Sequence, residues 1–393
     1  MFPTQFTGAS FTWEQVKLGD VAEITPGGTP SKNISDYWYP KEIPWLSSGE
    51  INKEIIFSTN DMISKKGFNN SSAKWINQNS VLIALAGQGK TRGKVAINRI
   101  PLTTNQSIAG IDPSDEIYYK FLYHQLTKDY LKLRLISSGD GSRGGLNKKL
   151  LNDYAVNLSG IDEQHKIGVL LSHIDNTLQL HEDHLQFLHS FKSFLLQKMF
   201  FDNDIPPLLR FNKFTEKWNQ CKLNDHTIVT MGQSPNSKNY TNNQTGKILV
   251  QGNADLYKNK ILKRVFTTEV TKTAVKNDIL ISVRAPVGDI ARNQYESVVI
   301  GRGIASIKGN DFLYYQLEKM KNNGFWNKYI AGSTFKSITG KDLKNTKIYT
   351  TNSDEERKIG NIFSSLTKII QLQEHKIDSL KKLKQFLLQN MFI

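Results

Sequence analysis

The chain of 393 residues contains an internal repeat. Two segments return 192 residues later: DEQHKIG (162–168) as DEERKIG (354–360), and FLLQKMF (194–200) as FLLQNMF (386–392). Upstream, the similar segments WEQVKLGD and WNQCKLND begin at Trp13 and Trp218, 205 residues apart. Because repeats at this spacing mark whole structural modules, the sequence predicts two modules of similar plan. The length of the chain excludes a small disulfide-linked scaffold.

The segments between these anchors are similar in pattern and different in detail. IPWLSSGEI at 43–51 lies opposite ILVQGNADL at 248–256, and NSVLIAL at 79–85 lies opposite NDILISV at 277–283. Short β-rich runs alternate with Gly, Pro, Asn and Ser, and helical patches are fewer. We therefore predict the α+β class, with two similar mixed α/β domains whose common frame carries a variable interior suited to two different targets.

Two long segments show the apolar spacing of a coiled coil, with steps of three and four residues. The seam positions are Ile167, Leu171, Ile174, Leu178, Leu185, Leu188, Leu195 and Met199 in the first, and Ile359, Phe363, Leu366, Ile370, Ile377, Leu380, Leu387 and Met391 in the second. Polar residues interrupt both seams at matching places, His181 and Lys192 in one and Gln373 and Lys384 in the other. Because polar seam residues fix helix alignment, we predict two long helices packed as an antiparallel coiled coil. Two separate amphipathic helices, each lying on its own domain, are the alternative.

The chain is basic, with 51 Lys and Arg against 36 Asp and Glu and a formal net charge of +15. The excess is larger in 201–352 (+11) than in 1–160 (+4), and a field of this sign favours nucleic acid. Cys221 is the single cysteine, which fits a reducing compartment. No apolar run reaches the roughly 18–20 residues that span a bilayer, and the N-terminus lacks a signal pattern, so we expect a cytoplasmic protein with no membrane partner.

Two motifs suggest catalytic or metal chemistry, and neither is complete. ALAGQGKT at 84–91 is similar to a phosphate loop, but the following RGKVAINRIPL has the pattern of a second strand, where a phosphate loop requires a helix. His181 and His184 have the spacing HEDH, which differs from the zinc motif HExxH. We therefore predict no catalytic residue, no metal site and no cofactor on this chain. A nucleic-acid-dependent ATPase of the phosphate-loop type and a non-catalytic DNA-binding scaffold are the alternative functions.

Basic and amide side chains on loops are the candidates for DNA contacts. Gln and Asn pair with adenine edges, Arg and Lys pair with guanine, and other cations hold phosphates. The candidates in the first module are Lys32, Ser47, Ser48, Gln88, Lys90, Arg92, Lys94, Asn105, Gln106 and Arg143. Those in the second module are Gln233, Asn236, Lys238, Gln251, Asn253, Arg284, Arg302, Thr334 and Lys336.

Over nearly its whole length the sequence resembles the DNA specificity (S) subunit of type I restriction-modification systems. The segments that carry the resemblance are KLGDVAEITPGGTPS (17–31), DEQHKIG, PPLLRFNKFTEKW (206–218), DILISVRAPVGDIA (278–291), GSTFKSITGKDLKN (332–345) and DEERKIG, in that order. The resemblance implies that the Gly-rich loop at 87–94, its counterpart at 284–289 and the GSTFKS loop face DNA. The first module departs from the family at 137–151, where SSGDGSRGGLNKKLL replaces the usual Ser-Thr loop.

The resemblance also implies a domain organisation and a set of partners. Residues 1–158 would form target recognition domain 1, 159–205 a central spacer helix and linker, 206–350 target recognition domain 2, and 351–393 a C-terminal spacer helix. Each domain would read one half of a bipartite site in double-stranded DNA, while the helices set the spacer and dock methyltransferase (M) subunits. Methylation and ATP-dependent cleavage would belong to the M subunits and to restriction/translocase (R) subunits, which would bind S-adenosylmethionine, ATP and Mg.

Overall fold

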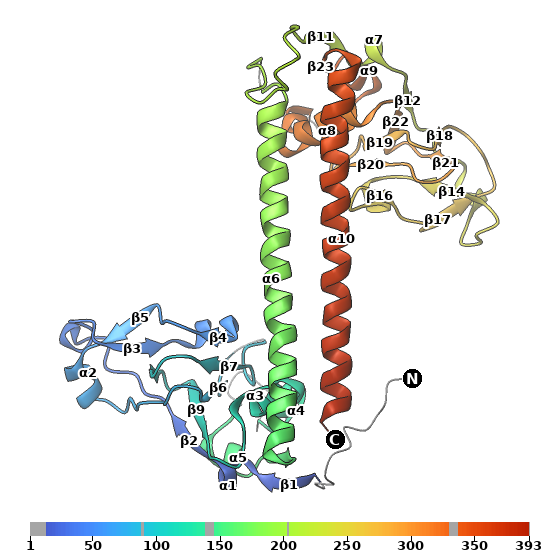
Figure 1. Ribbon diagram of the computed structural model, residues 1–393. Helices are drawn as coiled ribbons and strands as arrows, with labels where there is room; N and C mark the ends of the chain where they lie inside the picture. The colour runs from blue at the N-terminus through green and yellow to red at the C-terminus, as the bar shows by residue number, and fades with distance from the viewer. Residues whose placement is uncertain (1–12, 88–89, 138–144, 203, 330–336, 393) are drawn as a thin grey trace. The chain divides into compact units, whose positions relative to one another are not determined.

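The computed structural model of the chain describes residues 13–87, 90–137, 145–202, 204–329 and 337–392 (Figure 1). These residues form two compact units. Unit 1 comprises the described residues of 1–182 and 376–393, and unit 2 comprises those of 183–375. Each unit holds one globular domain together with parts of two long helices, α6 (Ile161–Met199) and α10 (Ser353–Met391), of 39 residues each.

The globular part of unit 1 contains β1 (Glu14–Lys17), α1 (Leu18–Val21), β2 (Ala22–Pro26), η1 (Ser35–Tyr37), β3 (Ile43–Leu46), η2 (Ser48–Lys53), β4 (Ile55–Ile56), β5 (Asp61–Ile63), α2 (Lys65–Asn69), β6 (Val81–Ala84), β7 (Val95–Asn98), β8 (Thr103–Thr104), β9 (Ile108–Pro113), α3 (Tyr119–Lys128), α4 (Tyr130–Ile136), α5 (Lys148–Asn152) and β10 (Ala155–Leu158).

The globular part of unit 2 contains β11 (Asn219–Lys222), α7 (Leu223–His226), β12 (Val229–Met231), η3 (Ser237–Asn239), β13 (Tyr240–Thr241), β14 (Lys247–Val250), η4 (Asn253–Asp255), β15 (Leu256–Tyr257), β16 (Lys260–Ile261), β17 (Val265–Thr267), β18 (Thr273–Val275), β19 (Ile279–Ser282), β20 (Ile290–Arg292), β21 (Ser297–Ile300), β22 (Ile304–Ile307), α8 (Asp311–Asn322), η5 (Phe325–Tyr329), α9 (Gly340–Lys344) and β23 (Lys347–Thr350).

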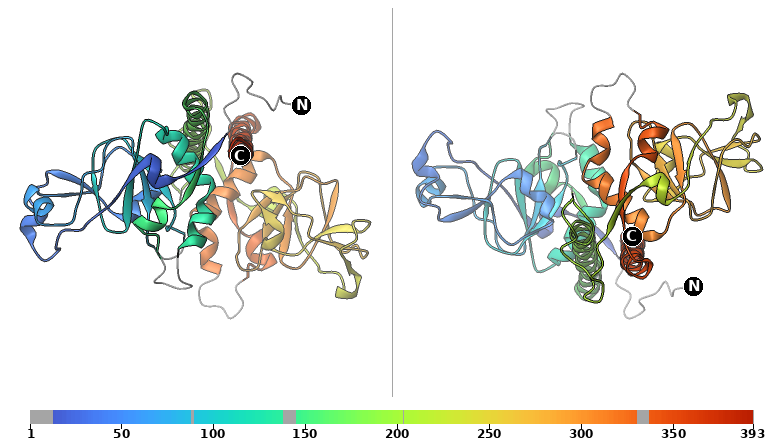
Figure 2. Two further views of the ribbon diagram at one scale, coloured as in Figure 1. Left: turned by 90° about the horizontal axis from the view of Figure 1, so that it is seen from below. Right: turned by 90° about the horizontal axis from the view of Figure 1, so that it is seen from above.

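The internal repeat is visible in the strand order of the two units. Unit 1 has a sheet of order β2-β9-β6-β7-β4 and unit 2 a sheet of order β12-β22-β19-β20, in which the first four strands correspond. A second sheet joins β3 to β8 in parallel in unit 1, and β14 to β21 in parallel in unit 2. In each unit these second sheets lie farther from the long helices than the first sheets (Figures 1 and 2).

The central strand of each first sheet is apolar along its whole length because both of its faces are buried. In β6, Val81 and Ile83 belong to the core cluster packed against α3 and the long helices, whereas Leu82 and Ala84 belong to a cluster on the opposite face. In unit 2, Ile279 and Ile281 of β19 likewise face one cluster and Leu280 faces another. Alternation across a strand buried on both sides produces the continuous runs VLIA and ILIS.

The two long helices are antiparallel, and this is seen separately in each unit. In unit 1 the first half of α6 lies beside the last part of α10, as the ion pair between Asp175 and Lys384 shows. In unit 2 the second half of α6 lies beside the first half of α10, with Leu188 packed on Leu366 and Ile370. The predicted coiled coil is therefore confirmed.

The repeated segments FLLQKMF and FLLQNMF end the two helices inside the two cores. Phe200 is 1% exposed in the core of unit 2, and Phe392 is 2% exposed in the core of unit 1. A lysine from the globular domain holds each end: the Lys319 ammonium donates to the carbonyls of Phe200 (3.1 Å) and Phe201 (2.6 Å), and the Lys128 ammonium donates to that of Phe392 (2.6 Å). Such contacts satisfy carbonyls that a helix end leaves without partners.

Among the described helices, none combines the length and the apolarity that crossing a lipid bilayer requires.

Candidate nucleic-acid interface

Four loops of unit 1 come together where strands of both sheets end. They are 27–32 after β2, 47–53 after β3, the described residues 85–87 and 90–94 between β6 and β7, and 105–107 between β8 and β9. Three backbone hydrogen bonds join them: Gly28 N–H to Thr104 O (2.8 Å), Asn105 N–H to Leu46 O (3.0 Å) and Leu85 N–H to Ser107 O (2.8 Å). We call this set of four loops the loop edge of unit 1.

Unit 2 has the same loop edge, built from 232–236, 251–255, 283–289 and 301–303. The joining hydrogen bonds are Arg302 N–H to Ser234 Oγ (3.0 Å), Gly301 N–H to Val250 O (2.8 Å) and Val283 N–H to Gly303 O (2.9 Å). The loops thus belong to the repeated frame, and their side chains differ between the units.

Close backbone approach is needed where the first loop of each edge meets the last. A Cβ on Gly27 would lie 2.1 Å from Thr104 Oγ1, and one on Gly232 would lie 2.2 Å from the carbonyl oxygen of Gly301. Only glycine fits there. This explains the glycine in both GGTPS and GQSPN segments.

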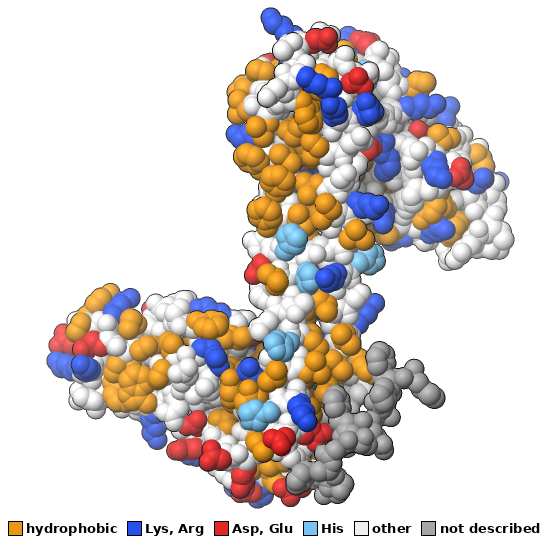
Figure 3. All heavy atoms as spheres, viewed as in Figure 1, with side chains coloured by type: hydrophobic (Ala, Val, Ile, Leu, Met, Phe, Trp, Pro, Cys, Tyr) orange, Lys and Arg blue, Asp and Glu red, His pale blue; other side chains and the backbone are white. Residues whose placement is uncertain are grey.

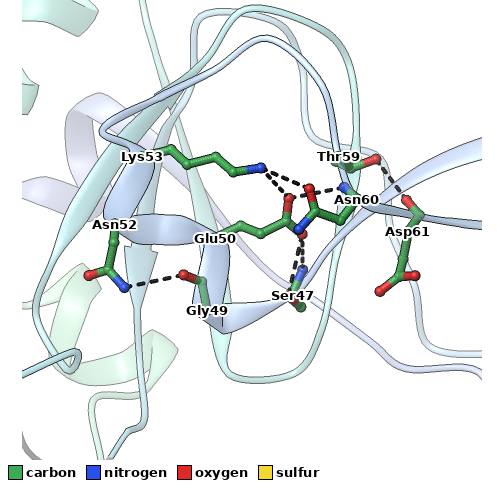
Figure 4. A network of polar contacts seen from close by, with 8 residues as sticks. All are labelled: Ser47, Gly49, Glu50, Asn52, Lys53, Thr59, Asn60 and Asp61. Carbon is green, nitrogen blue, oxygen red and sulfur yellow. Dashed lines mark hydrogen bonds and ion pairs between the residues drawn. The ribbon is translucent and has the colours of Figure 1, made fainter. Parts of the chain in front are cut away.

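A buried carboxylate organises the turn after β3 (Figure 4). The side chain of Glu50 is 4% exposed, and one of its oxygens accepts the Ser47 amide at 3.3 Å while the other accepts the Asn60 amide at 3.0 Å. The Lys53 ammonium lies 2.8 Å from the second oxygen. Burial alone would raise the pKa of the Glu50 carboxyl, but the hydrogen bonds from Lys53, Asn60 and Ser47 outweigh it and hold the pKa below its ordinary value. The carboxylate is therefore ionised at neutral pH.

The corresponding turn of unit 2 is organised by Asp255, which is 7% exposed. One carboxylate oxygen accepts the amides of Gln251 at 2.8 Å and Gly252 at 3.2 Å, and the Arg264 guanidinium lies 3.8 Å from the other. In each unit a side-chain hydrogen bond then ties the turn to the neighbouring hairpin. Lys94 donates to Asn52 at 2.7 Å in unit 1, and Asn253 donates to Asp289 at 2.5 Å in unit 2.

The structure places the described candidates of the first module on the loop edge of unit 1. Lys32, Lys90 and Gln106 are exposed, whereas Ser47, Ser48, Arg92, Lys94 and Asn105 are half-buried. The side chain of Gln106 meets the hydroxyl of Thr29, which links the first loop to the last. The Lys94 ammonium is engaged by Asn52, so it stabilises the edge in this structure.

In the second module, Gln233, Gln251, Asn253, Arg284 and Arg302 lie on the loop edge of unit 2. Gln233, Arg284 and Arg302 are exposed there. Asn236 ends the first loop of the edge and caps η3, and Lys238 lies within η3. The Asn236 amide donates to Glu269 at 2.8 Å, and its side chain accepts the Lys238 amide at 3.2 Å. Four further candidates, Gln88, Arg143, Thr334 and Lys336, lie outside the described residues.

The described residues of the Gly-rich segment ALAGQGKT, 84–87 and 90–91, belong to a strand hairpin. Strand β6 precedes it, and β7 follows it and pairs with β6 antiparallel, Leu82 opposite Ala96. Within the described residues after Lys90, a turn and a strand occupy the place where a phosphate loop has its helix. The phosphate-loop alternative lacks the geometry that it requires. In the described part of the chain, no group of three or more His, Cys, Asp and Glu side chains is placed to hold a metal ion.

Sequence reasoning did not single out Glu50 and Asp255, the carboxylates that shape the two turns. A signal was present for the first, because Ser47 and Glu50 have the S-x-x-E spacing of a capping box. For the second, the sequence GNAD places an acid at the same position of the repeat, 205 residues after Glu50.

Comparison with known proteins identifies the family. The family described as "Type I restriction modification DNA specificity domain" matches residues 11–189 and 215–382. The putative type I restriction enzyme MjaX specificity subunit of Methanocaldococcus jannaschii is 26% identical over 404 residues, which cover 95% of this chain and 91% of the relative.

Two solved structures share the fold over the whole length. The type I restriction-modification S subunit from M. genitalium has a TM-score of 0.68 at 16% identity and covers 100% of this chain and 99% of its own. A chain from a structure on complex assembly and conformational transition of the type I R-M system has a TM-score of 0.56 at 21% identity and covers 98% and 99%.

The duplicated domains with their paired loop edges are therefore DNA specificity domains, and the chain belongs to the type I restriction-modification DNA specificity family. It is a specificity subunit with two target recognition domains.

Proposed function

We propose that each unit reads one half of a bipartite site in double-stranded DNA through its loop edge. The observation that carries this proposal is the repeated edge itself: the same four loops recur in both units, while the residues that they present differ. Ser47 and Ser48 of unit 1 correspond to Gly252 and Asn253 of unit 2. Since bases are read by hydrogen-bonding side chains in the grooves, a common frame with different side chains reads two different half-sites.

The long helices dock two methyltransferase subunits, one on each unit. In unit 2, hydrophobic side chains gather on the surface of the long helices (Figure 3). Phe187, Phe191 and Phe194 of α6 are exposed, and a groove of about 390 Å³ is lined by Phe191, Leu195, Asn361, Ile362, Ser365, Leu366 and Ile369. In unit 1 the positions 192 residues away from Phe191 and Phe194 are Leu383 and Phe386, which are also exposed. An apolar helix face of this kind marks a protein-binding surface. Its repetition supports two copies of one partner.

In this assembly the chain is non-catalytic and binds no cofactor. The M subunits transfer methyl groups from S-adenosylmethionine, and R subunits with ATP and Mg translocate and cleave DNA. Basic residues supply the attraction to the DNA backbone, so binding is expected to weaken steeply with salt.

The test is adenine methylation, mapped by sequencing, in a host that carries this chain with its methyltransferase and in one that carries the methyltransferase alone. We expect a split, asymmetric motif only when the chain is present. If the two proteins form a stable complex and no new motif is methylated, the proposal is wrong.

The ATPase alternative predicts a different result. A phosphate-loop ATPase hydrolyses ATP without partners and loses this activity in Lys90→Ala. For a specificity subunit, we expect purified chain to hydrolyse no ATP with or without DNA.

A further inference from the structure

The two loop edges share a buried carboxylate although the residues around it differ. Glu50 and Asp255 occupy the same position of the repeat, whereas the three residues before them are Ser-Ser-Gly in unit 1 and Gly-Asn-Ala in unit 2. The three residues before the acid thus differ between the two copies, while both copies have an acid at this position. The acid therefore belongs to the part of the turn that both units share, and the three residues before it belong to the part that differs.

Both carboxylates form hydrogen bonds and an ion pair with groups of the protein itself. An ionised carboxylate out of water is costly unless hydrogen bonds and an opposite charge compensate it. Glu50 has two backbone amides and Lys53, and Asp255 has two backbone amides and Arg264. A negative charge on a surface that meets a polyanion is unfavourable. These contacts keep both carboxylates buried and paired within the protein.

The outer faces of the two turns are open. A Cβ built on Gly49 or on Gly252 meets no atom within 4 Å. The inner faces are fixed on two sides, by the hydrogen bonds that join each turn to the adjacent hairpin and to the last loop of the edge. The position of the outward side chains therefore depends on the shape of the turn, and that shape depends on the carboxylate.

We propose that Glu50 and Asp255 are positioning residues for DNA recognition, each of which holds the reading turn of its own unit in shape for one half-site. This inference rests on the proposed function. Neither carboxylate contacts DNA. Each acts through the backbone amides that it binds and so through the position of its turn, which carries Ser47 and Ser48 in unit 1 and Gln251 and Asn253 in unit 2.

The experiment uses the full chain in complex with its methyltransferase. The variants Glu50→Gln and Asp255→Asn remove the charge and keep the size of the side chain. Glu42→Gln and Glu296→Gln are the matched controls, since they remove exposed carboxylates of units 1 and 2 outside the loop edges. Affinity is measured for duplexes that carry the methylated motif and for duplexes with one base pair substituted in either half.

We expect Glu50→Gln to lose discrimination by about tenfold in one half-site, the scale of one base-pair contact, and to keep it in the other. Asp255→Asn should show the converse, and both controls should match the wild type. A purely structural role predicts equal loss in both halves, through a smaller fraction of folded complex. Equal loss, or unchanged discrimination in both halves, would overturn the inference.

Should Glu50→Gln fail to fold, the exposed Asn52 offers a second route. Asn52→Ala removes the link from the turn to Lys94 and the hydrogen bond from Asn52 to the Gly49 carbonyl, and it leaves the buried carboxylate in place. We expect relaxed discrimination in the same half-site with an unchanged melting temperature, and unchanged discrimination would again overturn the inference. A wild-type complex without a split motif contradicts the proposed function instead, so the two failures are distinguishable.

Discussion

Glu355 is a single residue that ties three segments of unit 2 together. Its side chain is 0% exposed and accepts hydrogen bonds from Arg210 Nε and Nη2, each at 2.8 Å. It also accepts the Trp218 indole N–H at 3.1 Å and the Thr351 hydroxyl at 2.6 Å. Burial would raise the pKa of this carboxyl, but the hydrogen bonds from Arg210, Thr351 and Trp218 outweigh it and hold the pKa below its ordinary value. The segment PPLLRFNKFTEKW thus supplies two donors to the first turn of α10.

Glu355→Gln is expected to destabilise unit 2 by about 3 kcal/mol at pH 7, the low end for a broken buried pair, because Arg210 is partly exposed. A carboxyl whose pKa is lowered by folding stabilises the fold above its unfolded pKa, and this stabilisation disappears as the pH falls through the folded pKa. Urea unfolding at pH 7 and pH 3 measures the difference between wild type and variant. The difference should shrink in acid, and a constant difference would contradict the assignment.

Two lysines at the same register position of the two helices form ion pairs with acidic residues on different elements. Lys384 of α10 pairs with Asp175 of α6, whereas Lys192 of α6 pairs with Glu318 of α8 at 2.8 Å. In the repeat, His124 and Tyr315 occupy equivalent places beside these pairs. Burial lowers the pKa of His124 to about 3, so this residue is neutral, and the positive charge that pairs with Asp175 is that of Lys384.

Lys384→Met is expected to destabilise unit 1 by about 2–4 kcal/mol, because it leaves Asp175 buried beside a neutral histidine. Adding Asp175→Leu should recover most of the loss, since apolar residues replace a buried pair at little cost. Lys381→Met is the control: it breaks an exposed pair with Glu182 and should cost less than about 1 kcal/mol. Denaturant midpoints test all three, and a double variant as unstable as Lys384→Met would refute the pairing.

The apolar helix face gives a prediction about assembly. Phe191→Glu places a charge in the groove of unit 2, and we expect affinity for the methyltransferase to fall about tenfold or more, as expected when burial of one aromatic side chain is lost. Leu131→Glu is the control, because Leu131 is also an exposed apolar residue, 68% exposed against 42% for Phe191, but lies on α4 in the globular part of unit 1. Calorimetric titration with the methyltransferase measures both. Equal affinity for wild type and Phe191→Glu would contradict docking on this face.

Some features of the fold can be predicted from the sequence alone, and others cannot. The seam of both helices and the strand that follows ALAGQGKT could be read because they depend on local periodicity. The parallel pairing of β3 with β8, whose residues Trp45 and Thr103 are far apart in the chain, could not. The partner of Lys192 is equally hidden, since Glu318 lies 126 residues away on another helix. The turns at 47–50 and 252–255 are an intermediate case. The S-x-x-E spacing of the first can be seen in the sequence, but the burial of the Glu50 carboxylate cannot.

At the scale of the whole molecule, the repeat produces an equivalent loop edge in each unit. Each long helix contributes residues to both units. Each core is completed by the end of a helix that begins in the other unit, Phe200 in unit 2 and Phe392 in unit 1. The two units are therefore connected by two helical segments, and neither helix can change length without its partner.

Removal of one heptad from each helix tests whether the helices set the spacer. Deleting 178–184 and 370–376, which are 192 residues apart, keeps the apolar seam in register. Seven residues shorten a helix by about 10 Å, so the methylated motif should keep both half-sites and lose up to about three base pairs of spacer at roughly 3.4 Å each. Deleting 178–184 alone is the control, and it should abolish assembly because the seams no longer match. Methylation mapping measures the result: a changed half-site, or an unchanged spacer in a stable double-deletion complex, would show that the helices do not set the distance.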